Sequence, residues 1–98
     1  MANPIVSFRK RSFLHPASTD ETSYIYARVE SSRDGEYPWG TNMLTIADCR
    51  RKIELEFFLC DKTDRRRSLA KINLLINFLT SFRDALAKEI ELIEKHDA

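Results

Sequence analysis

The last third of the chain, from Asp64 to His96, contains no glycine or proline and repeats its apolar residues with a helical period. At about 100° per residue, these side chains cover an arc of roughly 200°, about twice what a helix needs to pack on one core. The arc consists of Leu69, Ile72, Leu75, Ile76, Leu79, Phe82, Leu86, Ile90 and Ile93, with Leu74, Phe78, Ala85 and Leu92 on one flank. The pattern predicts one continuous helix over residues 64–96.

This helix is long for a chain of 98 residues. About 32 residues at about 1.5 Å each extend about 48 Å, whereas a domain of this size has a radius of gyration of about 13 Å. We therefore expect the helix to pack on its own domain and on a second copy of the chain. The alternative is a kink near Ser81 in a compact monomer. The expected dimer interface consists of Leu74, Phe78, Phe82, Ala85, Leu86, Ile90 and Ile93.

Four segments before the helix show the alternation of β-strands. They span residues 4–14, 23–31, 42–47 and 52–60. Turn-forming residues separate them, namely His15-Pro16, Asp34-Gly35 with Pro38, and the short connection from Asp48 to Arg51. Because no helix lies between consecutive strands, the sheet should be antiparallel. The predicted fold is a single α+β domain, a four-stranded antiparallel sheet followed by one long C-terminal helix (ββββα).

The alternation also predicts two faces of the sheet. Val6 and Phe8 should share one side of the first strand. The apolar face available to the helix would consist of Ile25, Val29, Leu44, Ile46, Ile53, Leu55 and Phe57. The opposite face would present Arg9, Arg11, Phe13, Tyr24, Tyr26, Arg28, Thr45, Lys52, Glu54 and Glu56.

Composition and charge narrow the cellular setting. A formal net charge of +1 does not by itself indicate a nucleic-acid or membrane partner, although basic residues cluster at 9–11, 50–52 and 65–67. Neither a signal peptide nor an apolar stretch of about 18 residues occurs, so we expect a cytoplasmic protein with no membrane partner. Cys49 and Cys60 lack a CxxC spacing and should lie at opposite ends of one strand, which favours reduced thiols.

Residues suited to catalysis are sparse. His15 and His96 lie outside any recognisable motif with a nucleophile, and two glycines are too few for a glycine-rich phosphate loop. The cysteines and histidines show no metal-ligand spacing. The sequence therefore predicts no enzyme, no cofactor and no metal site.

The polar sheet face combines the two residue types that bind single-stranded nucleic acids, cations for phosphates and aromatic rings for bases. Glu54 and Glu56 on the same face favour a different interpretation, in which they pair with arginines on neighbouring strands and the face is either solvated or covered by a protein partner. The predicted nucleic-acid-binding residues are Arg9, Arg11, Phe13, Tyr24, Tyr26, Arg28, Arg50, Arg51 and Lys52.

Arg65, Arg66 and Arg67 lie near the expected start of the helix, where the helix dipole disfavours cations. They could form an anion site at the helix start, or they could be solvated residues of a loop before a helix that begins later. The segment from Asp61 to Asp64 supplies candidate N-caps.

The segment Phe82-Arg83-Asp84-Ala85-Leu86-Ala87-Lys88 resembles the helix of PUR repeats, the units of the Pur-alpha nucleic-acid-binding proteins. The order of four strands and a helix is similar to that family, as is the Tyr-rich second strand followed by Leu44-Thr45-Ile46. The resemblance implies a curved antiparallel sheet, pairing of two repeats through the helix, and binding of single-stranded DNA or RNA on the sheet. The related ββββα fold of the PC4 coactivator and the Whirly proteins implies much the same.

We therefore expect a homodimeric single-stranded nucleic-acid-binding protein. The alternative is a protein-interaction module with neither nucleic-acid-binding nor catalytic activity.

Overall fold

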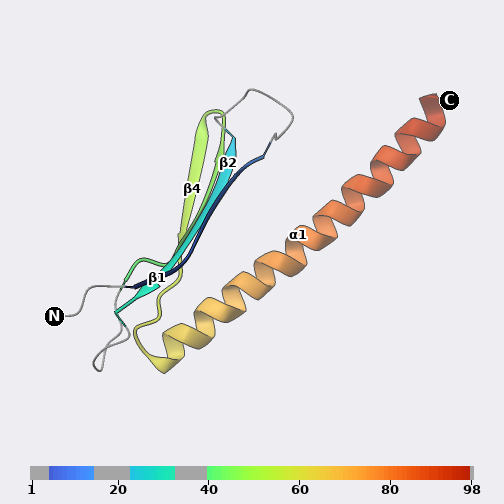
Figure 1. Ribbon diagram of the computed structural model, residues 1–98. Coiled ribbons are helices and arrows are strands. Elements are labelled where there is room, and N and C mark those ends of the chain that lie inside the picture. The colour runs from blue at the N-terminus through green and yellow to red at the C-terminus, as the bar shows by residue number, and fades with distance from the viewer. Residues whose placement is uncertain (1–4, 15–22, 33–39, 98) are drawn as a thin grey trace. The chain divides into compact units, whose positions relative to one another are not determined.

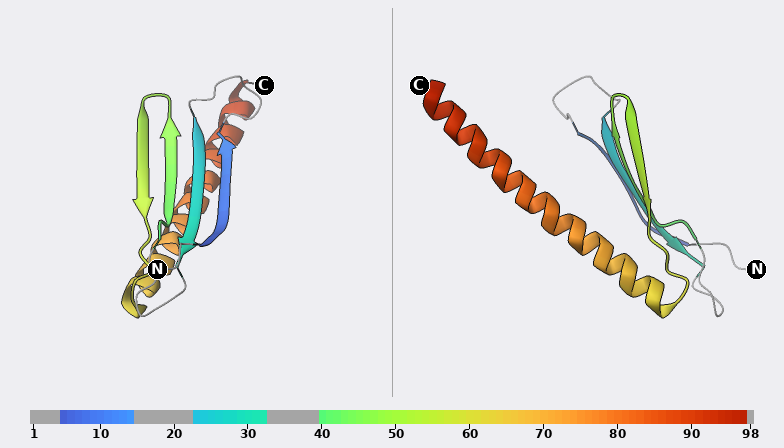
Figure 2. Two further views of the ribbon diagram at one scale, coloured as in Figure 1. Left: turned by 60° about the vertical axis from the view of Figure 1, so that its left-hand side comes forward. Right: turned by 180° about the vertical axis from the view of Figure 1, so that it is seen from behind.

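The computed structural model describes residues 5–14, 23–32 and 40–97. It contains strands β1 (Ile5–Phe13), β2 (Tyr24–Ser31), β3 (Met43–Asp48) and β4 (Arg51–Glu56), followed by helix α1 (Lys62–Asp97) (Figure 1). The strands pair antiparallel in the order β1-β2-β3-β4 and lie side by side in Figure 2. The predicted ββββα fold is therefore confirmed. The predicted turn residues His15, Pro16, Asp34, Gly35 and Pro38 lie outside the described residues.

The chain divides into two units, one up to Ser68 and one from Leu69 onward, and each is described by itself. The first unit contains the sheet and the first turns of α1, and the second unit is the rest of α1. No part of α1 combines the length and the hydropathy needed to cross a membrane, as judged over the described residues.

Strand β4 ends four residues earlier than predicted, at Glu56 rather than Cys60. The backbone N–H of Phe57 still donates to the carbonyl oxygen of Asn42 at 2.8 Å, but the pairing stops there. The next two carbonyl oxygens bind side chains from the start of α1: Ser68 Oγ donates to Phe58 at 2.6 Å and an Arg65 nitrogen donates to Leu59 at 3.0 Å. Phe57, predicted on the apolar face, therefore follows the strand.

A β-bulge in β1 separates two residues that were predicted to share a face. The pairing register shifts between Val6 and Phe8, so that Val6 lies opposite Glu30 and Phe8 lies opposite Val29. Residues that pair across antiparallel strands point to the same side, and the extra residue of a bulge reverses the alternation beyond it. Val6 therefore lies on the polar face, and the prediction for Val6 was wrong.

The pairing registers assign the remaining strand residues to two faces. We call one the tyrosine face, which consists of Val6, Arg9, Arg11, Phe13, Tyr24, Tyr26, Arg28, Glu30, Met43, Thr45, Ala47, Lys52, Glu54 and Glu56. The other, the apolar face, has Phe8, Ile25, Ala27, Val29, Leu44, Ile46, Ile53 and Leu55 at its centre. Both predicted faces are confirmed apart from Val6 and Phe57.

Two small residues at the centre of the tyrosine face are buried. Thr45 and Ala47 on β3 are 4% and 6% exposed, because the longer side chains of the neighbouring strands extend over them. On the apolar face, by contrast, Phe8, Val29 and Ile53 are exposed. The tyrosine face is thus a layer of long polar and aromatic side chains over a small buried centre.

Helix α1 begins two residues before the predicted start. Asp61 is its N-cap, because Oδ1 of Asp61 accepts the backbone N–H of Asp64 at 2.7 Å. Arg65, Arg66 and Arg67 consequently lie inside the helix, and the interpretation that placed them in a preceding loop was wrong.

The helix continues through its middle without a break (Figures 1 and 2). Thr80 Oγ1 donates to the carbonyl oxygen of Ile76 at 2.7 Å, and Ser81 Oγ donates to that of Asn77 at 3.1 Å. Both hydroxyl groups are therefore bonded within their own helix while the backbone stays helical. The alternative with a kink near Ser81 was wrong.

Candidate nucleic-acid interface

The centre of the candidate interface is a cation held over aromatic rings on β1 and β2. Arg11 pairs in register with Tyr26, and Phe13 pairs with Tyr24. The guanidinium carbon of Arg11 lies 4.5 Å from the ring centroid of Tyr24 and 5.5 Å from that of Phe13. Both distances fall within the range of cation–π attraction. The arrangement places a positive charge among three aromatic rings on one surface.

The base of this cluster is fixed by Ser23, which precedes β2 and is fully buried. Its hydroxyl donates to Asp48 Oδ1 at 3.1 Å at the end of β3, and its carbonyl oxygen accepts the N–H of Leu14 at 2.9 Å. These bonds tie the start of β2 to both neighbouring strands. Tyr24, the next residue, therefore projects from an anchored backbone.

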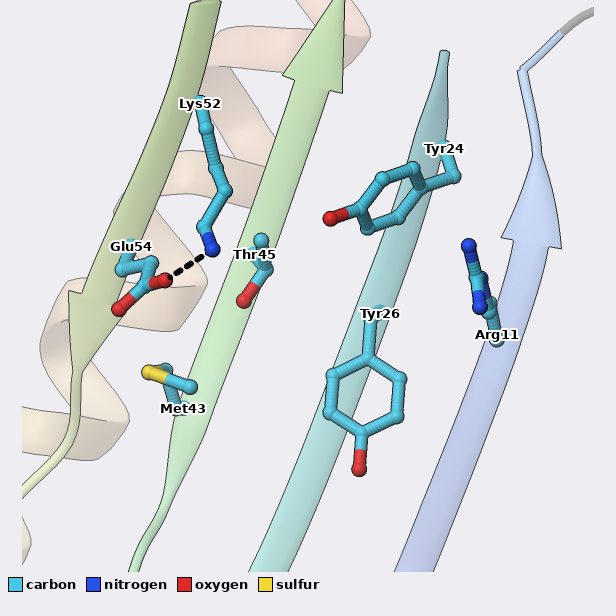
Figure 3. A pocket seen from close by; sticks show the side chains of 7 residues that line it. All are labelled: Arg11, Tyr24, Tyr26, Met43, Thr45, Lys52 and Glu54. Carbon is cyan, nitrogen blue, oxygen red and sulfur yellow. Dashed lines mark ion pairs between the residues drawn. The ribbon is translucent and has the colours of Figure 1, made fainter. Parts of the chain in front are cut away.

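A shallow hollow of about 270 Å³ lies beside the cluster. Figure 3 shows the rings of Tyr24 and Tyr26 following each other along β2, with Arg11 on one side and Thr45 on the other. Hydroxyl, carboxylate and ammonium groups at its walls can donate or accept hydrogen bonds. Its lining comes from all four strands and consists of Arg11, Tyr24, Tyr26, Met43, Thr45, Lys52 and Glu54.

Arg28 lies on the same face but is engaged by a carboxylate. Its Nε and one terminal nitrogen lie 3.0 and 2.7 Å from Oε2 of Glu30, two residues further along β2. The other carboxylate oxygen of Glu30 accepts the backbone N–H of Thr41 at 2.7 Å. That backbone bond, together with the contact with Arg28, lowers the pKa of Glu30. Glu30 is buried and Arg28 is half-buried, so the charge of Arg28 is neutralised where it lies.

Two further residues lock this end of the sheet around Glu30. Asn42 Oδ1 accepts the backbone N–H of Glu30 at 3.0 Å, and Asn42 is buried. Gly40 has a φ of +154°, and a Cβ there would lie 2.6 Å from the carbonyl oxygen of Glu30. Only glycine fits this close approach without strain. The Glu30 end of the tyrosine face is therefore a closed hydrogen-bonded structure.

Lys52 on β4 is neutralised in a similar way. Its Nζ lies 2.9 Å from Glu54 Oε1, two residues along the same strand (Figure 3). The hydrogen bond to Glu54 raises the pKa of Lys52. The partner of Glu54 is thus a lysine of its own strand, whereas the protein-interaction hypothesis expected arginines on neighbouring strands.

Two of the predicted nucleic-acid-binding residues lie off the tyrosine face. Arg51 pairs in register with Asp48, and the next pair, Ala47 with Lys52, belongs to the tyrosine face. Because side chains alternate along a strand, Arg51 lies on the opposite side. Arg50 belongs to the tight turn between β3 and β4, next to Cys49, whose φ is +36°. The structure therefore brings together Arg9, Arg11, Phe13, Tyr24, Tyr26, Arg28 and Lys52 on one face.

Sequence reasoning missed Met43, Ser23 and the role of Glu30. Met43 alternates with Leu44 along β3, which was the available signal for its place on the tyrosine face. Glu30 stands two residues after Arg28 in a predicted strand, which places both on one face. The contact between Ser23 and Asp48 depends on strand register and has no local signal.

The predicted dimer interface lies along α1, and its large apolar side chains are exposed. The pairing of two chains stays a prediction. Among the described residues, no group of three or more histidines, cysteines, aspartates and glutamates could hold a metal ion. Cys49 and Cys60 are exposed thiols outside any disulfide; Cys49 lies in the turn before β4, and Cys60 lies between β4 and α1.

No protein-family model, curated protein or solved structure matches this chain. The resemblance to PUR repeats stays a prediction, and the functional argument depends on the geometry above.

Proposed function

We propose that the chain is a homodimeric single-stranded nucleic-acid-binding protein that uses the β1–β2 half of the tyrosine face. The observation that carries this proposal is the Arg11 guanidinium 4.5 Å from the ring of Tyr24, with Phe13 and Tyr26 beside it. Proteins that bind single strands without a strong sequence preference combine such cations with aromatic stacking surfaces. We assign it no catalytic activity.

The proposed path of the strand follows the edge of the sheet. Arg9 and Arg11 lie on the same side of β1, the edge strand, and would contact successive phosphates. Bases would stack on Tyr24, Tyr26 and Phe13, and a base edge would reach the polar groups of the adjacent hollow. Arg28 and Lys52 contribute less, since their charges are already bound by Glu30 and Glu54.

A titration of a fluorescently labelled single strand of about 20 nucleotides, followed by anisotropy at several salt concentrations, tests the proposal. Affinity should fall as salt rises, with a slope in log–log form of about −0.7 for each phosphate contact. No measurable affinity at low salt, or an affinity that does not respond to salt, would contradict it.

Strand β1 offers a matched control in two adjacent residues, Lys10 and Arg11. Arg11→Ala should weaken binding and make the salt slope shallower by about 0.7, since one phosphate contact is lost. Lys10→Ala removes the same charge from the opposite side of the strand, where Lys10 pairs with Ala27, and should leave both quantities unchanged. Equal effects of the two substitutions would show that bulk charge, rather than the tyrosine face, binds the oligonucleotide.

The second candidate is a protein-interaction module with no nucleic-acid role. The pairs Arg28–Glu30 and Lys52–Glu54 favour it, because they reduce the positive charge of the tyrosine face. In that case the titration shows no binding to either DNA or RNA.

A further inference from the structure

Helix α1 carries opposite charges at its two ends. Residues 62–71 contain five cations, Lys62, Arg65, Arg66, Arg67 and Lys71, and one acid, Asp64, which leaves a net charge of +4. Residues 88–97 contain four acids, Glu89, Glu91, Glu94 and Asp97, and two lysines, Lys88 and Lys95, which leaves −2 with His96 neutral. Two copies of this helix attract each other when antiparallel, whereas a parallel pair places like charges together.

The apolar residues of α1 have a matching symmetry. With Leu69 at position a of a heptad, positions a and d are occupied at alternating spacings of three and four residues. These positions hold Leu69, Ile72, Ile76, Leu79, Arg83, Leu86, Ile90 and Ile93. They lie at equal distances on either side of Ser81, as the pairs 69 and 93, 72 and 90, 76 and 86, and 79 and 83 show. The a and d positions are therefore spaced symmetrically about Ser81, and apolar residues fill all of them except position 83, which is Arg.

We propose that α1 pairs with the α1 of a second copy as an antiparallel coiled coil centred on Ser81. Leu69 then faces the partner's Ile93, Ile72 faces the partner's Ile90, and Ile76 faces the partner's Leu86, each contact occurring twice. The proposal rests on the homodimer of the proposed function and adds its orientation and register. It does not depend on nucleic-acid binding.

The flanks of the seam are complementary in this register. Arg66 and Glu94 both occupy position e, and each Arg66 meets the partner's Glu94 across the pair. Near the two-fold axis, Phe82 at position g meets the partner's Phe82, an aromatic contact of the kind that stabilises interfaces. The contacts at positions e and g therefore bring compatible side chains together in the same register that aligns positions a and d.

The polar residues at the centre are compatible with a packed seam. Thr80 lies at position e, and its hydroxyl is already bonded to Ile76 of its own helix. Arg83 occupies position a opposite the partner's Leu79, and its guanidinium donates to Asp84 Oδ1 at 2.9 and 3.1 Å. The head of Arg83 can thus stay at the surface while its aliphatic stem covers the seam.

The seam uses only part of the interface predicted from sequence. Four residues of the predicted interface belong to the seam, namely Phe82, Leu86, Ile90 and Ile93. Each is between 47% and 56% exposed and therefore has apolar area left to bury. Leu74, Phe78 and Ala85 lie at outer heptad positions in this register. The revised interface therefore omits those three residues and gains four apolar ones, Leu69, Ile72, Ile76 and Leu79.

Cysteine cross-linking tests the orientation in a chain that carries Cys49→Ser and Cys60→Ser. Leu69→Cys and Ile93→Cys are made separately, mixed, and oxidised. The antiparallel seam predicts a covalent dimer of the two different variants and none from Leu69→Cys alone. A covalent dimer from Leu69→Cys alone would establish parallel pairing, and a dimer without either cross-link would overturn the register.

A charge exchange tests the register without altering the apolar seam. Arg66→Glu and Glu94→Arg should each raise the dimer dissociation constant about 3- to 10-fold, since two ion pairs become like-charge contacts. The double variant should recover the original value. Arg67→Glu makes the same change of net charge one residue further along, outside the seam, and is the matched control, which should have a clearly smaller effect.

Sedimentation equilibrium in the absence of nucleic acid gives the dissociation constants. Failure of the double variant to recover, or an equal effect of Arg67→Glu, would overturn the register while leaving the dimer intact. A chain that stays monomeric at every concentration would overturn the homodimer itself, whatever the oligonucleotide titration shows.

Discussion

An arginine lies toward each end of the tyrosine face, but the two guanidinium groups contact different partners. At one end, the residue two positions after Arg11 is Phe13, and the guanidinium lies against aromatic rings. At the other end, the residue two positions after Arg28 is Glu30, and the guanidinium is bound by a carboxylate. Residues two apart on a strand share a face, so this neighbour decides whether a cation is neutralised or available to a ligand.

The largest expected effect removes the aromatic surface at the Arg11 end. Tyr24→Ala with Tyr26→Ala should weaken oligonucleotide binding by about 100-fold or more, because stacking contributes about 1–3 kcal/mol for each base. Tyr24→Phe with Tyr26→Phe keeps the rings and is the matched control, expected within about threefold of the original. Anisotropy titrations at one salt concentration make the comparison. Similar losses in both double variants would mean that hydroxyl groups, not rings, hold the strand.

A substitution at the Glu30 end should change the stability of the fold rather than oligonucleotide binding. Glu30→Gln removes the charge that binds Arg28, and we expect a loss of about 1–3 kcal/mol in the free energy of unfolding, measured by urea denaturation. The released Arg28 charge should leave oligonucleotide affinity unchanged or higher. Weaker binding at full stability would contradict the division between the two ends.

The pH dependence of this loss has a defined sign. The pKa of Glu30 is lowered from its ordinary value of 4.5 by the Thr41 N–H and by Arg28, so the folded state favours the ionised carboxylate. The unfolded chain therefore binds the proton more readily, and stability from this group is present above pH 4.5 and lost as pH falls through the lowered pKa. The difference between the original chain and Glu30→Gln, followed by urea denaturation, should shrink on acidification. A constant difference down to pH 2.5 would contradict it.

The smallest expected effect concerns the exposed pair on β4. Glu54→Gln removes the carboxylate that binds Lys52, and the free energy of unfolding should change little because both side chains are exposed. The released ammonium should steepen the salt slope of binding by about 0.7. Thr63→Ser lies in α1, outside the sheet, and serves as a control substitution that should leave the salt slope unchanged. An unchanged slope in Glu54→Gln would place the strand away from Lys52.

The order of elements could be predicted from sequence because alternation and helical periodicity are local signals. The 3.6-residue pattern after Asp64 and the alternation around Tyr24 both correspond to observed elements. The end of β4 could not be predicted in this way. Phe58 and Leu59 continue the alternation, yet their carbonyl oxygens accept hydrogen bonds from side chains of α1. These are tertiary contacts, which compete with strand pairing and leave no local signal in the sequence.

The candidate site was less predictable than the fold. The face of Val6 depends on a bulge that no sequence signal marked, and the face of Arg51 depends on where the tight turn places the start of β4. The aromatic residues and Arg11 were identified correctly as sharing a face, because strict alternation continues between Arg9 and Phe13. Which cations are neutralised depended on side-chain geometry that alternation does not specify.

The most direct measurement is a side-chain NMR titration of the chain with a single-stranded oligonucleotide. The account predicts that the ring resonances of Tyr24 and Tyr26 shift upfield as bases stack on them, in step with the Nε–H signal of Arg11. The methyl signals of Ile25 and Ile53, on the apolar face, should stay in place. Shifts confined to those methyl groups, with unchanged tyrosine rings, would contradict the assignment of the tyrosine face as the nucleic-acid interface.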